Sequence, residues 1–194
     1  NGVDPEKFRP EAADSTARSI LCVGNLIPTK GQGVLLQAFA MMQADLPESV
    51  CEFIGDGPDR EKLASMATKL GVRVLFRGRK SRAEVAEAMR RCTIFALPSG
   101  YEGLGCVYLE AMASGKAAIG CRAQGIDEVI EHGANGWLVR SGSVEDLAHA
   151  LSVLLQDSQL RKSLGEQARQ TVLRRLTLAH QAEGLAGIYR RCAA

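Results

Sequence analysis

The sequence predicts an α/β fold, a doubly wound parallel sheet of about six strands with helices on both faces and further helices at the C-terminal end. Two observations support this prediction. Short apolar runs of strand length alternate with stretches of helical period from about residue 19 to residue 139. Beyond that point the apolar pattern is helical only. Strand–helix alternation of this kind is typical of a parallel sheet covered by helices.

Each predicted element rests on its own local pattern. Strands are expected at the short apolar runs, which lie at residues 19–24, 50–55, 72–76, 94–97, 117–121 and 136–139. Helices are expected where apolar residues recur every three or four positions, at about 31–42, 59–70, 81–92, 107–114, 126–131, 143–154, 160–172 and 178–192. Two helices begin with a capping pair, Ser81 with Glu84 and Ser143 with Asp146.

The stretch from Leu97 to Gly115 is the most informative part of the chain. A strand ends there, a loop with Glu102, Gly103 and Gly105 follows, and Glu110 lies within the apolar helix after it. Bare amides at a helix start favour an anion, and a carboxylate among apolar neighbours needs partners. A polar ligand at the carboxyl end of the strand would satisfy both. A simple turn or a solvated glutamate explains either feature alone, so only their combination favours a ligand.

A second candidate site is the loop at residues 24–31, which reads GNLIPTKG and joins the first strand to its helix. Lys30 stands at a helix N-terminus, where the helix dipole disfavours a cation. A ligand phosphate between this lysine and the helix amides would explain its position, although a solvated lysine is the default for such a loop. Neither a P-loop nor a dinucleotide fingerprint occurs in the chain.

Composition narrows the class of function. The chain has 194 residues, and its net charge of +2 does not indicate a nucleic-acid partner. No apolar run reaches the ~18 residues of a membrane span. The six cysteines form no C-x-x-C pair or zinc-spaced cluster, so mostly buried free thiols in a reducing cytoplasm are expected. Because the chain begins at Asn1 rather than methionine, we expect it to be a fragment.

Several other features have more than one interpretation. The basic segment 77–82 is either a solvated loop or a surface that attracts an anionic nucleotide or a membrane. The histidines at positions 132, 149 and 180 are expected on the surface, and Trp137 in the core or a pocket wall. A glycosidase acid/base pair formed by Glu102 and Glu110 is disfavoured, because one lies on the helix that the other introduces.

These residues together resemble the retaining glycosyltransferases of the GT-B fold, family 4, also called group 1. Glu102-Gly103-Leu104-Gly105 followed by Glu110-Ala111-Met112-Ala113 looks like the E-x7-E motif of that family. Weaker matches extend over nearly the whole chain, at residues 1–4, 24–31, 55–58, 76–78 and 136–139. The resemblance implies the C-terminal, donor-binding half of a two-domain enzyme that transfers a hexose-type sugar from a nucleotide-sugar with retention.

The resemblance also implies a role for each site residue. Glu110 would accept hydrogen bonds from ribose hydroxyls, Glu102 would face the donor sugar, and Lys30 would bind the diphosphate. Glu102 and Lys30 would be the catalytic residues, and positive charge and amides would stabilise the departing diphosphate. The donor-binding residues would be Asn25, Lys30, Arg77, Gly78, Gly103, Leu104, Gly105 and Glu110.

Cofactors, partners and domains follow from the same resemblance. The donor would be UDP- or GDP-linked, no metal or other cofactor would be needed, and no nucleic acid would bind. The missing partner would be an N-terminal acceptor domain, without which little transfer is expected. The parent enzyme would act in the cytoplasm or at the cytoplasmic face of a membrane. Residues 1–16 would be an interdomain linker, 17–175 a Rossmann-like nucleotide-sugar-binding domain and 176–194 a C-terminal helix.

Asn25 departs from the family pattern, which usually has an arginine at this position. Asparagine donates hydrogen bonds but carries no charge, so another arginine substitutes, or leaving-group stabilisation is weaker, or the donor differs. Two rival functions stay open. A nucleotide-sugar epimerase would need a base near the sugar, and a non-catalytic module of the same fold would dock a protein partner. Fold alone does not decide between them.

Overall fold

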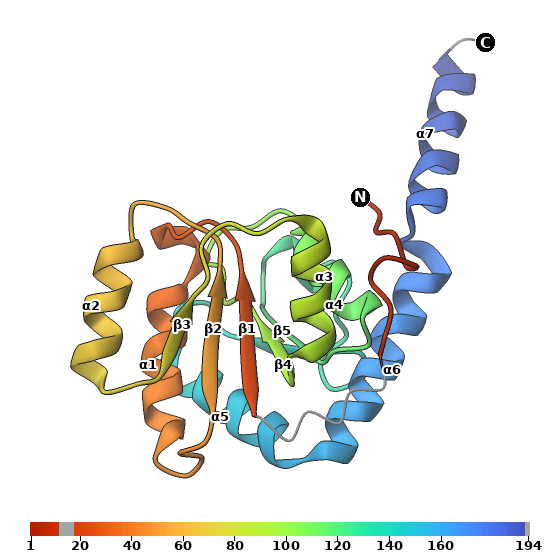
Figure 1. The fold of residues 1–194 in the computed structure, drawn as a ribbon. Helices are drawn as coiled ribbons and strands as arrows, with labels where there is room; N and C mark the ends of the chain where they lie inside the picture. Colours follow the sequence, from red (N-terminus) through yellow and green to blue (C-terminus); the bar gives the residue numbers. More distant parts are fainter. Residues whose placement is uncertain (12–17, 193–194) are drawn as a thin grey trace.

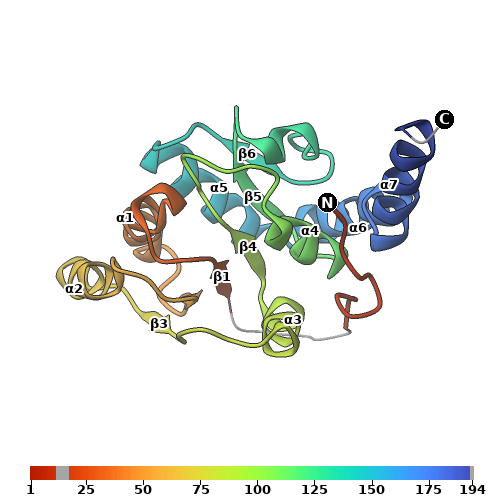
Figure 2. The ribbon, with the colours of Figure 1, turned by 90° about the horizontal axis from the view of Figure 1, so that it is seen from above.

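The computed structural model describes residues 1–11 and 18–192. Within these residues, six parallel strands form one sheet in the order β3-β2-β1-β4-β5-β6 (Figures 1 and 2). In chain order the strands are β1 (Ser19–Val23), β2 (Val50–Ile54), β3 (Val74–Phe76), β4 (Ile94–Ala96), β5 (Ala118–Cys121) and β6 (Trp137–Val139). The predicted doubly wound parallel sheet is confirmed.

Helices cover both faces of the sheet, as predicted (Figure 2). They are α1 (Gln32–Gln43), α2 (Arg60–Leu70), α3 (Arg82–Arg91), α4 (Cys106–Ala113), α5 (Val144–Gln156), α6 (Ser158–Arg175) and α7 (Leu178–Cys192). α1 packs against α2 and α5 in one layer, and α4 packs against α3 and α6 in the other. The expected caps of α3 and α5 are both present.

The structure corrects the start of one predicted strand and the type of one predicted helix. The strand expected from Val72 begins only at Val74. The helix expected at 126–131 is a short 3-10 helix, η2 (Gly125–Glu128), because the amide of Val129 bonds the carbonyl of Ile126 three residues back. A second 3-10 helix, η1 (Pro28–Lys30), lies in the loop before α1.

The strand order places a switch point between β1 and β4. From β1 the chain adds strands outward to β3, then returns to β4 on the other side of β1 and continues to β6. The loops after β1 and β4 therefore begin at neighbouring strand ends and lead to helices in opposite layers (Figure 2). Open α/β sheets bind ligands at this place.

Backbone contacts hold these two loops together. Gly31 has φ of +71°, and a Cβ atom at this residue would lie 2.0 Å from the carbonyl oxygen of Pro98. The amide of Gly100 donates to the carbonyl of Thr29 at 2.8 Å. Glycine is required at Gly31 both by its left-handed conformation and by this close approach. The loop after β1 consequently rests directly on the loop after β4.

The N-terminal segment packs against the domain. Val3 forms a β-bridge with Thr177, and the side chains of Val3 and Phe8 are fully buried in the core. Figure 1 shows this segment beside α6. Residues 12–17, which span the end of the predicted linker and the start of the predicted domain, lie outside the described residues, as do residues 193–194 of the predicted C-terminal helix. The proposed linker role stays a prediction.

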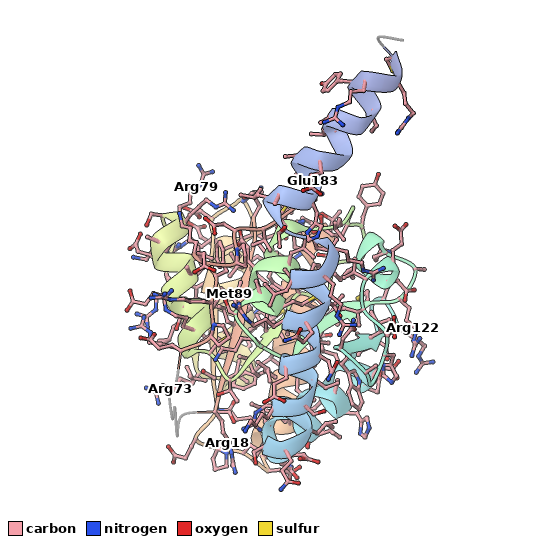
Figure 3. The ribbon with its side chains drawn as sticks, turned by 90° about the vertical axis from the view of Figure 1, so that its right-hand side faces the viewer. Arg18, Arg73, Arg79, Met89, Arg122 and Glu183 are labelled. Carbon is pink, nitrogen blue, oxygen red and sulfur yellow. The ribbon has the colours of Figure 1, made fainter. Side chains whose placement is uncertain are left out.

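The last helix, α7, extends away from the body of the domain (Figures 1 and 3) and carries Glu183. None of the side chains of α7 is buried. Its large apolar side chains that are exposed to solvent are Leu178, Leu185, Ile188 and Tyr189. Among the described residues, no helix combines the length and the apolar character that crossing a membrane requires.

Candidate functional site

Lys30 and Glu102 form an ion pair across the switch point, although 72 positions separate them in the sequence. Lys30 ends η1 after β1, and Glu102 lies in the loop after β4. Lys30 Nζ donates to Glu102 Oε2, and the two side chains are 20% and 13% exposed. The structure thus brings together the two residues that were predicted to be catalytic. Lys30 is not the solvated lysine that its loop alone would favour.

The loop from Gly103 to Gly105 lies beside this ion pair. Within the described part of the chain, the amides of this loop donate no hydrogen bond to the protein. Gly105 is the N-cap of α4, has φ of +64° and supplies no side-chain cap. The amide of Glu102 donates to Gln124 Oε1 at 3.0 Å, and Gly125 packs against the carbonyl of Gly103. Bare amides at a helix start favour an anion.

Glu110 is buried on α4, and its side chain is only 9% exposed. Nη2 of Arg82, at the start of α3, donates to Glu110 Oε1 at 2.9 Å. Burial raises the pKa of the Glu110 carboxyl, whereas the hydrogen bond and the charge of Arg82 act in the opposite direction. Glu110 is therefore not the solvated glutamate that was the alternative interpretation of its position.

The other predicted donor-binding residues lie in the loops after β1 and β3 and make contacts within the protein. Asn25 is exposed, and its carbonyl accepts a hydrogen bond from a side chain of α1 at 2.9 Å. Arg77 forms an ion pair with Glu52, with 3.2 Å between Nε and Oε1. Gly78 has φ of +68°, and its carbonyl accepts an amide from the loop after β2. Each is thus fixed at the carboxyl-end edge of the sheet.

Three residues of this region were not singled out by sequence reasoning. Arg82 was grouped with the basic segment 77–82, and its partner could not be inferred. Gln32 is 2% exposed and donates to the carbonyl of Asn25. A polar residue in the first turn of an otherwise apolar helix was the available signal for it. Gln124, which accepts the amide of Glu102, had no such signal.

The remaining candidates lie elsewhere. His132 and His149 are exposed, and the ring of His132 packs on the half-buried Trp137 of β6 with centroids 4.8 Å apart. Four of the six free cysteines are buried, and desolvation raises the pKa of Cys22 and of Cys92 to about 12, so these thiols stay protonated. In residues 1–11 and 18–192 there is no cluster of three or more His, Cys, Asp or Glu side chains that could hold a metal.

The fold and these contacts define a doubly wound α/β domain whose polar side chains gather at the switch point of its sheet. The chain matches the family model "Glycosyl transferases group 1" over residues 3–171, and it belongs to that family. The resemblance based on the E-x7-E stretch is thereby confirmed.

Several curated proteins are similar to this chain. It is 35% identical over 181 residues to the sulfoquinovosyl transferase SQD2 of Arabidopsis thaliana, covering 87% of this chain and 35% of that protein. It is 34% identical over 172 residues to the N-acetyl-alpha-D-glucosaminyl L-malate synthase of Bacillus anthracis, covering 87% and 44%. A GDP-mannose-dependent alpha-(1-6)-phosphatidylinositol monomannoside mannosyltransferase of Mycolicibacterium smegmatis is 30% identical over 192 residues, with 89% and 50% covered. The chain spans half or less of each relative.

Solved structures show the same fold. The C-terminal domain of a glycosyl transferase group 1 family protein, LpcC of Francisella tularensis, superposes with a TM-score of 0.84 at 26% identity, covering 91% of this chain and 100% of that domain. HepE of Anabaena, solved in complex with UDP, gives a TM-score of 0.86 at 26% identity, covering 96% and 56%. This chain therefore has the fold of a C-terminal domain of group 1 glycosyltransferases.

Proposed function

We propose that this chain is the donor-binding half of a retaining glycosyltransferase that transfers a hexose-type sugar from a UDP- or GDP-linked donor. One observation carries the proposal: Lys30 and Glu102 meet at the switch point of the sheet, beside the bare amides of residues 103–105. The choice of donor is supported by HepE, which was solved with UDP, and by the GDP-mannose-dependent relative.

In this proposal the diphosphate of the donor lies between Lys30 and the amides at the start of α4. Breaking the bond between sugar and diphosphate leaves additional negative charge on the leaving group. A cation and fixed amide dipoles stabilise that charge without having to reorganise during the reaction. Asn25 contributes hydrogen bonds rather than charge, so Lys30 supplies the main positive charge on this side. Arg77 and Gly78 lie near the base.

Glu102 faces the donor sugar, together with the amides of Gly103, Leu104 and Gly105. Because Glu102 is paired with Lys30, a bound diphosphate competes with this carboxylate and replaces it as the partner of the lysine. This exchange frees Glu102 to accept sugar hydroxyls. Glu110 accepts the ribose hydroxyls, which compensates the burial of its charge.

For the whole enzyme we propose an acceptor-binding domain N-terminal to this one, connected through residues 1–16. Lys30 supplies a positive charge and the amides supply fixed dipoles for the departing diphosphate, so we propose that the reaction needs no metal. The enzyme acts in the cytoplasm or at the cytoplasmic face of a membrane. An epimerase activity is less well supported, because none of the three histidines, all within the described residues, is hydrogen-bonded to Lys30, Glu102 or Glu110.

Isothermal titration with UDP, GDP and ADP tests the proposal. At least one of the three is expected to bind saturably. Glu110→Ala should weaken that binding by about 1.5–3 kcal/mol, because a charge-assisted hydrogen bond is lost. Glu183→Ala, on the exposed surface of α7, is the matched control and should leave the affinity unchanged. Absence of binding by all three nucleotides would contradict the proposal and favour a protein-docking module. Normal affinity in Glu110→Ala would contradict the proposal because it removes Glu110 from the nucleotide site.

A further inference from the structure

Arg82 occupies a position that is electrostatically unfavourable for a cation. It is the first residue of α3, where the helix dipole favours negative charge. The capping box formed by Ser81 and Glu84 fixes the backbone at this point. Hydrogen bonds from Lys80 and from the amide of Ser81 lower the pKa of Glu84 to about 2, so this cap stays ionised over the working pH range. The backbone from which the Arg82 side chain extends is therefore held by a stable cap.

Two contacts hold the guanidinium of Arg82. Nη2 donates to Oε1 of Glu110 at 2.9 Å, and Cζ lies 5.9 Å from the ring centroid of Phe8. Phe8 is fully buried, so the ring is a rigid surface for a cation–π contact. Within residues 1–11 and 18–192, Oε2 of Glu110 accepts no hydrogen bond from the protein. One oxygen is thus occupied by Arg82 while the other stays available.

The two partners differ strongly in exposure, because the side chain of Arg82 is 65% exposed and that of Glu110 is 9% exposed. An ion pair between two exposed residues contributes little. Here, however, removal of the arginine would leave a buried carboxylate without its hydrogen-bond donor. Lys7 of the N-terminal segment also acts on the Glu110 carboxyl, and its charge lowers the pKa of that group. Arg169 of α6 donates to the carbonyl of Ala113 at the end of α4.

We propose that Arg82 is a positioning residue of the nucleotide site, which holds the Glu110 carboxylate ionised and oriented so that Oε2 accepts a ribose hydroxyl. This inference rests on the proposed function, because it assigns Glu110 to the ribose. Arg82 acts through Glu110 and contacts no reacting atom. Phe8 and the capping box keep Arg82 in place, so the N-terminal segment contributes indirectly to nucleotide binding.

The first test uses the ligand-free protein and does not depend on nucleotide binding. Carbon-13 NMR titration of the Glu110 carboxyl should give a higher pKa in Arg82→Gln than in the wild type, and Arg82→Lys should recover part of the difference. Arg91→Gln, at the other end of α3 and paired with the exposed Glu87, is the matched control and should leave this pKa unchanged. An unchanged pKa in Arg82→Gln would overturn the inference.

The second test measures UDP and GDP affinity between about pH 5 and pH 8. Arg82→Gln should bind about tenfold more weakly than the wild type at the acidic end, and the deficit should shrink as the pH rises and Glu110 ionises. The nucleotide affinity of Arg82→Lys should lie between those of Arg82→Gln and the wild type. A deficit that is the same at every pH would indicate a merely structural role and overturn the inference alone. If the wild type binds neither nucleotide while the carboxyl pKa still shifts, the proposed function itself fails.

Discussion

The two glutamates of the E-x7-E stretch are both paired with a cation from another element, yet their surroundings differ. Glu102 lies in a loop, and its partner Lys30 is nearly as enclosed as it is, with side chains 13% and 20% exposed. Glu110 lies within a helix at 9% exposure, and its partner Arg82 is 65% exposed. The first pair joins the loops of β1 and β4, whereas the second joins α3 and α4.

This difference indicates different roles for the two cations. A diphosphate at the switch point competes with Glu102 for Lys30, so the first pair has to open when the ligand binds. A ribose hydroxyl needs only the free oxygen of Glu110, so the second pair can persist in the complex. The first cation is therefore expected to bind the ligand, and the second to hold its partner in position.

The largest expected effect concerns Phe8, which packs against Arg82 of the Arg82–Glu110 pair. Phe8→Ala removes a fully buried ring that packs against Arg82. It should lower the free energy of unfolding by about 3–5 kcal/mol, as measured by urea denaturation. Tyr101→Ala, at an aromatic residue that is 81% exposed, should change it by less than about 0.5 kcal/mol. A loss below about 1 kcal/mol for Phe8→Ala would show that the N-terminal segment is not part of the folded domain.

Removing the lysine of the first pair should weaken UDP binding, whereas removing its glutamate should not. Lys30→Met should weaken UDP binding by about 1.5–3 kcal/mol, because a charged donor to the diphosphate is lost. Glu102→Gln should leave UDP binding unchanged or strengthen it by up to about 1 kcal/mol, since the lysine loses its internal competitor. Lys62→Met, at an exposed residue of α2, controls for net charge. Equal weakening by both substitutions would show that Glu102 binds the nucleotide directly.

The smallest effect concerns the pH dependence of stability. Because the pKa of Glu110 is raised in the folded state, the folded protein holds this proton more tightly than the unfolded chain, and stability falls as the pH rises through that pKa. Glu110→Gln removes this cost and should raise Tm at neutral pH by ~1–3 °C. The gain should vanish below the unfolded pKa of about 4.3. Calorimetry of Glu110→Gln and the wild type at several pH values measures this difference in Tm. A lower Tm of Glu110→Gln than of the wild type at neutral pH would contradict the account.

Local patterns in the sequence were sufficient to predict the fold. Strand-length apolar runs and helical periods gave the sheet and its helices, and the Ser81 and Ser143 caps were correct because capping depends on neighbours in sequence. The pairing of Lys30 with Glu102 could be expected only in outline, from the rule that ligand sites lie at strand ends.

The contacts that hold the Glu110 carboxylate in place could not be predicted from local patterns. Arg82 looked like one member of an exposed basic segment, and Phe8 like part of a linker without periodicity. Their contact depends on how α3, α4 and the N-terminal segment pack, which no local pattern encodes. The same holds for Gln124, whose contact with the amide of Glu102 crosses from one loop to another.

Amide chemical-shift mapping of a UDP or GDP titration tests the central claim most directly. The account predicts saturable shifts for the amides of Lys30 and Gly31, of the loop 103–105 and of the residues around Glu110, with none along α7. Saturable shifts confined to α7 or to the N-terminal segment, or no shift at any nucleotide concentration, would contradict the assignment of the donor site to the switch point of the sheet.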